Sequence, residues 1–105
     1  MSARQDGVVR PVKRIEIVAD SATATRLLAA LDRIGLHDYT VMKEVFGHGT
    51  RGDRGGDPFS GTFDNSFILL VVAPDHTERV VEVIGPLLRR FGGICVLSDA
   101  AQLES

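Results

Sequence analysis

The sequence lacks the features that define several large classes of protein. The N-terminus has no apolar signal core and no stretch is long enough to span a membrane, so we expect a cytoplasmic protein. The single cysteine, Cys95, lies in the apolar run 94–97. This predicts a buried thiol in a reducing compartment, and not a metal ligand or a nucleophile. A net charge of −2 provides no general attraction to nucleic acid or to anionic membranes.

Catalytic and metal-binding patterns are also missing. No Ser-His-Asp, Cys-His or carboxylate pair stands out, so we do not expect an enzyme. His37 and His76 lie in expected turns, and nothing pairs them at the spacing of metal ligands, so no metal site is predicted. The acidic residues Asp53, Asp57 and Asp64 match no calcium loop, and the solubility of a loop explains them.

The pattern of apolar residues predicts one small α+β domain. We expect a loose polar tail over residues 1–12 and a single domain over residues 13–105 of the chain. Alternating or continuous apolar segments predict strands over 13–19, 39–46, 65–73 and 94–97, with a short tail after the last.

Helix boundary signals separate these strands. Asp20 or Ser21 can cap a first helix, which Gly35 should end. Asp75 is the expected cap of a second helix, and Gly85-Pro86 should kink that helix or divide it in two.

The resulting order is β-α-β-β-α-β, the ferredoxin-like arrangement with a four-stranded antiparallel sheet and both helices on one face. Because the third strand is apolar almost throughout, the second face of the sheet needs a cover, for which we expect another copy of the chain.

A glycine-rich segment between the second and third strands has no periodic pattern. Six of the eleven glycines lie between Gly47 and Gly61. Loops of this length in small domains are usually functional or disordered. The amides around Gly47 and Gly49, the Thr50 hydroxyl and two guanidinium groups, Arg51 and Arg54, are the materials of a site for a di- or triphosphate. The alternative is a solvated loop with incidental arginines.

A second glycine-arginine segment precedes the last strand. It consists of Arg89, Arg90, Phe91, Gly92 and Gly93. Its arginines can be ordinary charges at a helix C-terminus, which the helix dipole favours, or a second phosphate clamp. In an oligomer, the two segments of adjacent subunits can enclose one anionic ligand. His48 is a weaker candidate for contact with phosphate or bicarbonate.

From Lys13 to Leu103 the chain resembles the PII signalling superfamily, whose long T-loop would be residues 47–64 and whose B-loop would be residues 89–93. The closer resemblance is to the PII-like branch linked to inorganic-carbon uptake. It rests on three segments of this sequence: Tyr39-Thr40-Val41, Gly47-His48-Gly49-Thr50-Arg51 followed by Arg54, and Phe91-Gly92-Gly93-Ile94. The predicted T-loop has no tyrosine, so the uridylylation of classical nitrogen-signalling members is not expected.

The resemblance implies a homotrimer that binds an adenine nucleotide, ADP, AMP or ATP, between subunits, with bicarbonate beside it. Thr40 and Val41 would line the base pocket. The phosphates would be held by Gly47, His48, Gly49, Thr50, Arg51 and Arg54 from one side and by Arg89, Arg90, Phe91, Gly92 and Gly93 from the other. A bicarbonate transporter or a carboxysome protein would then recognise the ordered T-loop. The alternatives are a nitrogen-sensing PII protein, a trimeric metal-tolerance-type protein of similar fold, and an enzyme acting on a phosphorylated substrate.

Overall fold

The computed structural model describes residues 8–45, 48–49, 52–53 and 64–104. Four of the predicted phosphate-binding residues, Gly47, Thr50, Arg51 and Arg54, lie outside these ranges.

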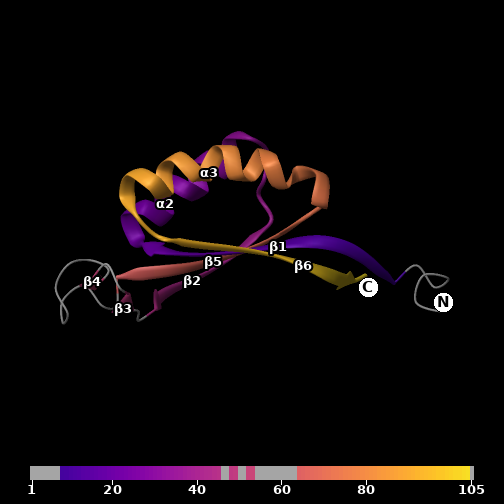
Figure 1. Cartoon of the computed structure of the whole chain (residues 1–105), viewed down its shortest axis with the longest axis horizontal. Coiled ribbons are helices and arrows are strands. Elements are labelled where there is room, and N and C mark those ends of the chain that lie inside the picture. Colours follow the sequence, from indigo (N-terminus) through magenta and orange to yellow (C-terminus); the bar gives the residue numbers. More distant parts are fainter. Residues whose placement is uncertain (1–7, 46–47, 50–51, 54–63, 105) are drawn as a thin grey trace.

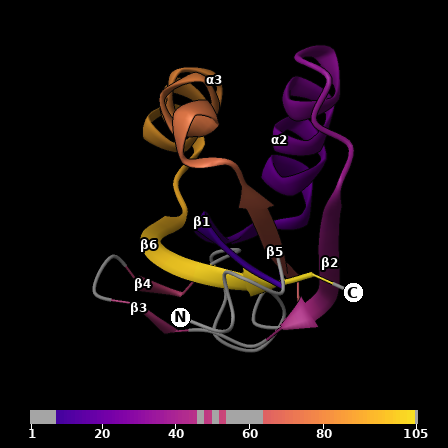
Figure 2. The same cartoon turned by 90° about the vertical axis from the view of Figure 1, so that its right-hand side faces the viewer.

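The main sheet has four antiparallel strands in the order β2-β5-β1-β6 (Figure 1). Along the chain, the elements of the main body are β1 (Val9–Asp20), α2 (Ser21–Arg33), β2 (Tyr39–Val45), β5 (Asn65–Val72), α3 (Thr77–Phe91) and β6 (Ile94–Leu103). Two short strands, β3 (His48–Gly49) and β4 (Gly52–Asp53), pair separately. Figure 2 shows both helices on one side of the sheet. The ferredoxin-like β-α-β-β-α-β fold is therefore confirmed.

Helix α2 begins and ends where its signals indicate. The Asp20 side chain accepts a hydrogen bond of 2.8 Å from the Thr23 amide, which satisfies one of the free N–H groups of the first turn. After the helix, Gly35 adopts a φ of +85°, a conformation in which glycine has no steric penalty. Both the cap at Asp20 and the stop at Gly35 are confirmed.

Strands β1 and β6 are both longer than the sequence pattern predicts. Strand β1 begins at Val9, so the prediction of a tail up to residue 12 was wrong for residues 9–12. Strand β6 continues to Leu103, where a short tail was expected after Leu97. The two extensions pair with each other, from Val9 opposite Leu103 onward. Each segment is weakly patterned alone, and the hydrogen bonds between them hold both in the sheet.

Helix α3 differs from the prediction at two points. Asp75 is not its cap, because it lies inside a short 3-10 turn (Pro74–His76) and makes no capping hydrogen bond there. The sequence pattern predicts that Gly85-Pro86 kinks the helix or divides it in two. The helix is not divided and continues through Pro86 to Phe91. Proline removes the hydrogen bond to the carbonyl of Glu82, but both residues are exposed, so water can satisfy that carbonyl. Buried Val80 and Ile84 hold the helix on the core before Pro86, and Leu87 and Leu88 pack against the core after it.

The core lies between the sheet and the helices. Its fully buried members include Ile15 and Ile17 of β1, Leu27 and Leu31 of α2, Ile68 and Leu70 of β5, and Val80 and Ile84 of α3.

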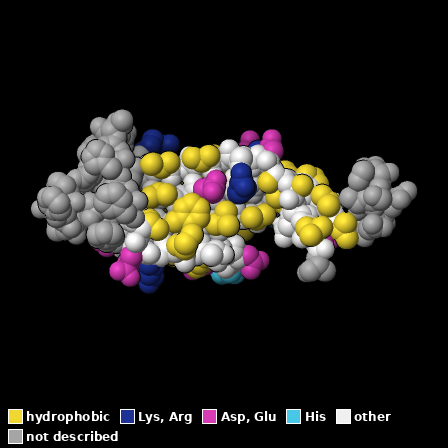
Figure 3. Space-filling view, turned by 90° about the horizontal axis from the view of Figure 1, so that it is seen from below, with side chains coloured by type: hydrophobic (Ala, Val, Ile, Leu, Met, Phe, Trp, Pro, Cys, Tyr) yellow, Lys and Arg dark blue, Asp and Glu magenta, His cyan; other side chains and the backbone are white. Residues whose placement is uncertain are grey.

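The opposite side of the sheet, here called the open face, is not covered by the helices. It displays residues that alternate with the core residues, including Met42, Leu69, Val71, Ile94 and Val96. Met42 and Val96 are 55% and 51% exposed. Figure 3 looks onto this face and shows hydrophobic side chains over much of its middle. The expectation of an apolar second face is confirmed.

We predict that Gly93→Ala destabilises the fold more than Gly35→Ala. Both glycines have positive φ values, of +140° and +85°, so alanine strains either backbone by about 1–2 kcal/mol. At Gly93 a Cβ would also lie 2.8 Å from Leu88 Cδ2 and 3.0 Å from the Val18 carbonyl oxygen, which adds about 1–3 kcal/mol of overpacking. At Gly35 no atom lies within 4 Å. Urea denaturation at one protein concentration measures both, and equal losses would contradict the prediction.

Candidate functional site

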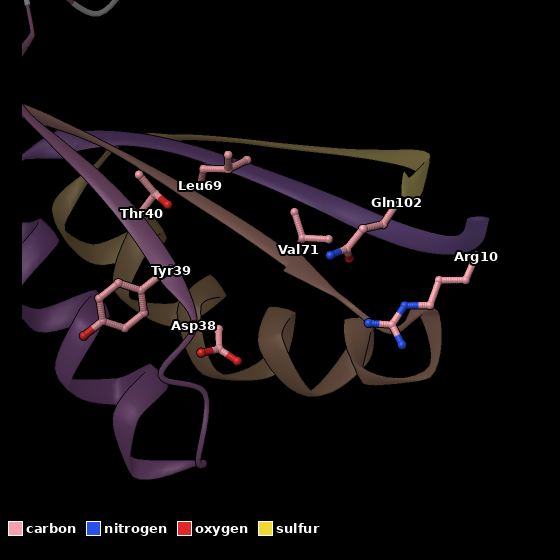
Figure 4. A pocket seen from close by; sticks show the side chains of 7 residues that line it. All are labelled: Arg10, Asp38, Tyr39, Thr40, Leu69, Val71 and Gln102. Atoms are coloured by element: carbon pink, nitrogen blue, oxygen red, sulfur yellow. The ribbon is translucent and has the colours of Figure 1, made fainter. Parts of the chain in front are cut away.

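A shallow cavity of about 480 Å³ opens on the open face (Figure 4). Its volume falls in the range of small-molecule sites. Its lining comes from β2, β5, the far ends of β1 and β6, and the residue before β2. The lining residues are Arg10, Asp38, Tyr39, Thr40, Leu69, Val71 and Gln102.

The predicted base-pocket residues Thr40 and Val41 are separated by the sheet. Thr40 lines the cavity, beside its β-sheet neighbour Leu69. Val41 packs against the core on the helix side. This follows from the alternation of side chains along a strand, since two successive residues point to opposite faces. Of the pair, Thr40 is therefore the residue that can meet a ligand in the cavity.

Tyr39 borders the cavity while its ring points toward α2 (Figure 4). The hydroxyl donates a hydrogen bond of 3.3 Å to Asp32 Oδ1, and His37 Nδ1 lies 3.0 Å from the same oxygen. Loss of solvent around the tyrosine and the charge of the Asp32 carboxylate both raise the pKa of Tyr39. The hydroxyl therefore stays protonated and fastens the start of β2 to α2.

The far end of the cavity carries polar groups that the sequence patterns did not single out. Arg10 of β1 and Gln102 of β6 lie directly opposite each other in the strand register, and both line the cavity. Arg10 Nε also lies 2.8 Å from Glu104 Oε2, an ion pair between the two strand extensions. Arg10 and Gln102 lie in segments that the sequence pattern predicts to be tails. Neither segment carries a sequence pattern that marks a binding residue. Together with Thr40 and Asp38 they supply hydrogen-bonding groups around an apolar floor of Leu69 and Val71.

The second glycine-arginine segment lies at the C-terminal end of α3. Arg89 and Arg90 are exposed in the last turn. The Gly92 amide donates a hydrogen bond of 2.8 Å to the Leu88 carbonyl and closes the helix. The guanidinium carbons of Arg26 and Arg90 lie 4.5 and 5.1 Å from the centroid of the Phe91 ring. Cations at such distances are attracted by the electron-rich ring face.

Arg26 is the residue of this cluster that sequence reasoning missed. It lies on α2, sixty-five positions from Phe91, and its helix gave only an apolar pattern. The packing of α2 against α3 brings it to the end of α3. The guanidinium groups of Arg26 and Arg90 thus lie against Phe91, just before the Gly92-Gly93 turn. Arg89 points back along α3, since its Nη1 lies 3.4 Å from where a Cβ of Gly85 would stand. This arrangement can attract an anion.

Strand β2 ends and β5 begins at the same end of the molecule as the C-terminal end of α3 (Figure 1). Strand β2 is bulged between Lys43 and Val45, and Glu44 between them has a φ of +61°. A bulge bends a strand and ends its regular pairing. At the other end of the loop, the Asp64 carbonyl accepts a hydrogen bond of 3.0 Å from the Ser21 amide at the start of α2. Of the loop residues predicted to bind phosphate, the structure describes His48 and Gly49, which belong to β3 of the β3–β4 pair.

The cavity and the end of α3 lie on opposite sides of the sheet of one chain. The cavity belongs to the open face, whereas Arg89 to Gly93 belong to the helix layer and the turn that follows it. One chain therefore does not bring Thr40 together with the arginines of α3. A ligand that meets both would have to lie between two chains.

In the ranges that the structure describes, the remaining reactive groups are scattered along the chain and form no cluster. Within the described part of the chain, no three His, Cys, Asp or Glu residues are placed to hold a metal ion. Cys95 is half-buried rather than fully buried, and loss of solvent raises the pKa of its thiol. No helix in the described ranges is long and apolar enough to cross a membrane.

The fold is that of a PII-type protein. The sequence pattern of the nitrogen regulatory protein P-II family matches residues 12–104, and the chain belongs to this family. No curated protein matches the sequence.

Several solved structures share the fold over almost the whole chain. A structure of CPII, a nitrogen regulatory PII-like protein from Thiomonas intermedia K12, superposes with a TM-score of 0.75 at 21% identity, covering 92% of this chain and 97% of that one. The apo form of CPII gives a TM-score of 0.73 at 18% identity, covering 92% and 97% of the two chains. A PII-like signalling protein from Thermus thermophilus gives 0.67 at 21% identity, covering 90% and 91%.

We predict that Phe91 is energetically coupled to Arg26. A double-mutant cycle of Phe91→Leu and Arg26→Met should give a coupling of about 0.5–1 kcal/mol, the strength of an exposed cation–π contact. Urea denaturation of the two single variants and the double variant measures it. Arg79→Met, at an exposed position near the other end of α3, is the matched control and should show no coupling to Phe91. Equal coupling for both arginines would contradict the contact.

Proposed function

We propose that this PII-like regulatory protein binds an adenine nucleotide, ADP, AMP or ATP, between the subunits of a homotrimer. The observation that supports this most is the division of the candidate site. A cavity suited to a base lies on the open face, and an arginine cluster suited to phosphate lies at the end of α3. CPII, which has the same fold, has been solved bound to ADP, AMP and bicarbonate.

The cavity on the open face fits the base. Leu69 and Val71 offer an apolar floor for a planar ring, and Thr40 and Asp38 at the rim offer a hydroxyl and a carboxylate. A carboxylate accepts hydrogen bonds, as from the exocyclic amino group of adenine, and the Thr40 hydroxyl can donate to a ring nitrogen. In this proposal Val41 supports the strand from the core side and does not contact the base.

The phosphates are held by the two glycine-arginine segments. Arg89, Arg90 and the Gly92-Gly93 backbone act from the end of α3, next to Phe91, and Arg26 adds a further cation there. The T-loop contributes Gly47, His48, Gly49, Thr50, Arg51 and Arg54. Arginine binds phosphate through two parallel hydrogen bonds, so each such residue fixes orientation as well as charge.

The homotrimer is supported by the open face. Met42, Ile94 and Val96 expose large apolar side chains there, and exposed apolar side chains gathered on one face mark an interaction site. Covering this face with further copies also brings the cavity of one chain toward the loops of another. The ligand then completes its site only in the assembly.

The regulatory step is ordering of the T-loop. Bicarbonate binds beside the nucleotide, and the loop closes over both. A partner protein then recognises the ordered loop. We propose a bicarbonate transporter or a carboxysome-associated protein as that partner, so that the protein regulates inorganic-carbon uptake. The main alternative is a nitrogen-regulatory role, which the name of the family supports.

Calorimetry with ADP, in the presence and absence of bicarbonate, tests the ligands. We expect binding that Arg51→Ala or Arg54→Ala weakens at least about tenfold, because each removes a charge-assisted contact with phosphate. Arg79→Ala, which removes an exposed charge from the first turn of α3, is the control and should bind normally. Absence of nucleotide binding by the assembled wild-type protein would overturn the proposal.

Substitution of Thr40 tests the position of the base. Thr40→Val keeps the shape of the side chain and removes its hydroxyl, so ADP affinity should fall about tenfold if a ligand group loses its hydrogen bond. Thr40→Ser keeps the hydroxyl and should retain most of the affinity. Unchanged calorimetric affinity in Thr40→Val would place the base elsewhere.

A further inference from the structure

An ion pair stands in the middle of the open face. Alternation along β1 puts Arg14 and Glu16 on this face, and β1 is a central strand of the sheet. The register places Glu16 between Leu69 and Val96, and Arg14 beside Val71. Figure 3 shows one acidic and one basic group side by side among the hydrophobic side chains of this face. The two charges therefore stand where an apolar interface would have its centre.

Within one chain these charges are only partly satisfied. Arg14 Nε donates a hydrogen bond of 3.1 Å to Ser98 Oγ, but it lies 3.8 Å from Glu16 Oε1, beyond hydrogen-bonding distance. The ranges that the structure describes offer neither side chain another ion-pair partner. The side chains of Arg14 and Glu16 remain 49% and 37% exposed, so water still satisfies much of both groups.

These two charges restrict what can cover the face. A purely apolar cover would remove water from both charges and give nothing in return, which is strongly unfavourable. The cover must present an acid to Arg14 and a base to Glu16, amid apolar side chains. A second copy of the same face meets both requirements, because it carries one charge of each sign, two residues apart, with the same apolar neighbours.

We propose that Arg14 of one copy pairs with Glu16 of the next when copies of this chain assemble through their open faces. The pairing selects the register of assembly, since a shifted arrangement would bury both charges without partners. The inference rests on the oligomer of the proposed function. It adds the two side chains that specify how its subunits meet.

Charge exchange between chains tests the pairing. Arg14→Glu and Glu16→Arg are purified separately, and their masses are compared with the wild type by sedimentation velocity over a range of concentrations. Each variant alone places like charges at every contact, so its half-assembly concentration should rise at least about tenfold. An equal mixture of the two should form trimers that contain both chains. Two of their three contacts pair an acid with a base and one keeps like charges, so the half-assembly concentration should lie between those of the single variants and of the wild type. The double variant R14E/E16R should assemble like the wild type.

The mixture separates pairing between chains from pairing within one chain. Mixing leaves the two like charges inside each chain unchanged, so only contacts between chains can restore assembly. Circular dichroism establishes that each variant is folded, and if a single variant does not fold, assembly of the double variant decides. The control pair is Lys13 and Asp99, an ion pair between β1 and β6 on the helix side of the sheet. Lys13→Glu and Asp99→Lys should leave assembly unchanged.

Two outcomes would overturn the inference and leave the nucleotide proposal standing. One is a wild-type oligomer with single variants that assemble equally well. The other is a double variant that stays dissociated, or a mixture that assembles no better than the single variants. A monomeric wild-type protein would overturn the proposed trimer as well.

Discussion

The pairing of β1 with both of its neighbours is the constraint on which the rest of the structure depends. Strand β1 bonds to β5 on one side and to β6 on the other. Its side chains alternate, so Ile15 and Ile17 enter the core while Arg14 and Glu16 stand on the open face. Because the period is two, a slip of one residue would exchange these sets and bury the charges under the helices. The register therefore fixes the core, the cavity and the charged centre of the open face together.

Within one chain, the sheet separates the two parts of the candidate site. The cavity around Thr40 and the arginine cluster around Phe91 lie on its opposite sides, so a ligand that spans them joins two chains. Ligand binding and assembly then favour each other by mass action. In the proposed trimer, a nucleotide would therefore act through the subunit interface itself. The hydrogen bond between Ser21 and Asp64 holds the start of β5 beside the start of α2, at the same end of the molecule as the C-terminal end of α3.

Most of the fold was predictable because its signals are local. The apolar periodicity of each strand, the Asp20 cap and the Gly35 stop act within a few residues of the chain, and the structure confirms them. The ends of β1 and β6 were missed because each is held by the other, more than eighty residues away. Arg26 was missed for the same reason, since its partner Phe91 belongs to the other helix.

The sequence by itself determined the order of the elements and the side of the sheet that each strand residue faces. Strand alternation alone separates Thr40 from Val41, although the similarity of this segment to a family motif grouped them in one pocket. Only the tertiary structure decided which distant groups meet: Arg10 with Glu104, Arg26 with Phe91, and the cavity with the far ends of β1 and β6. Periodicity reports how a residue is oriented within its own element. Contacts between elements depend on how whole surfaces pack, and no short stretch of sequence encodes that.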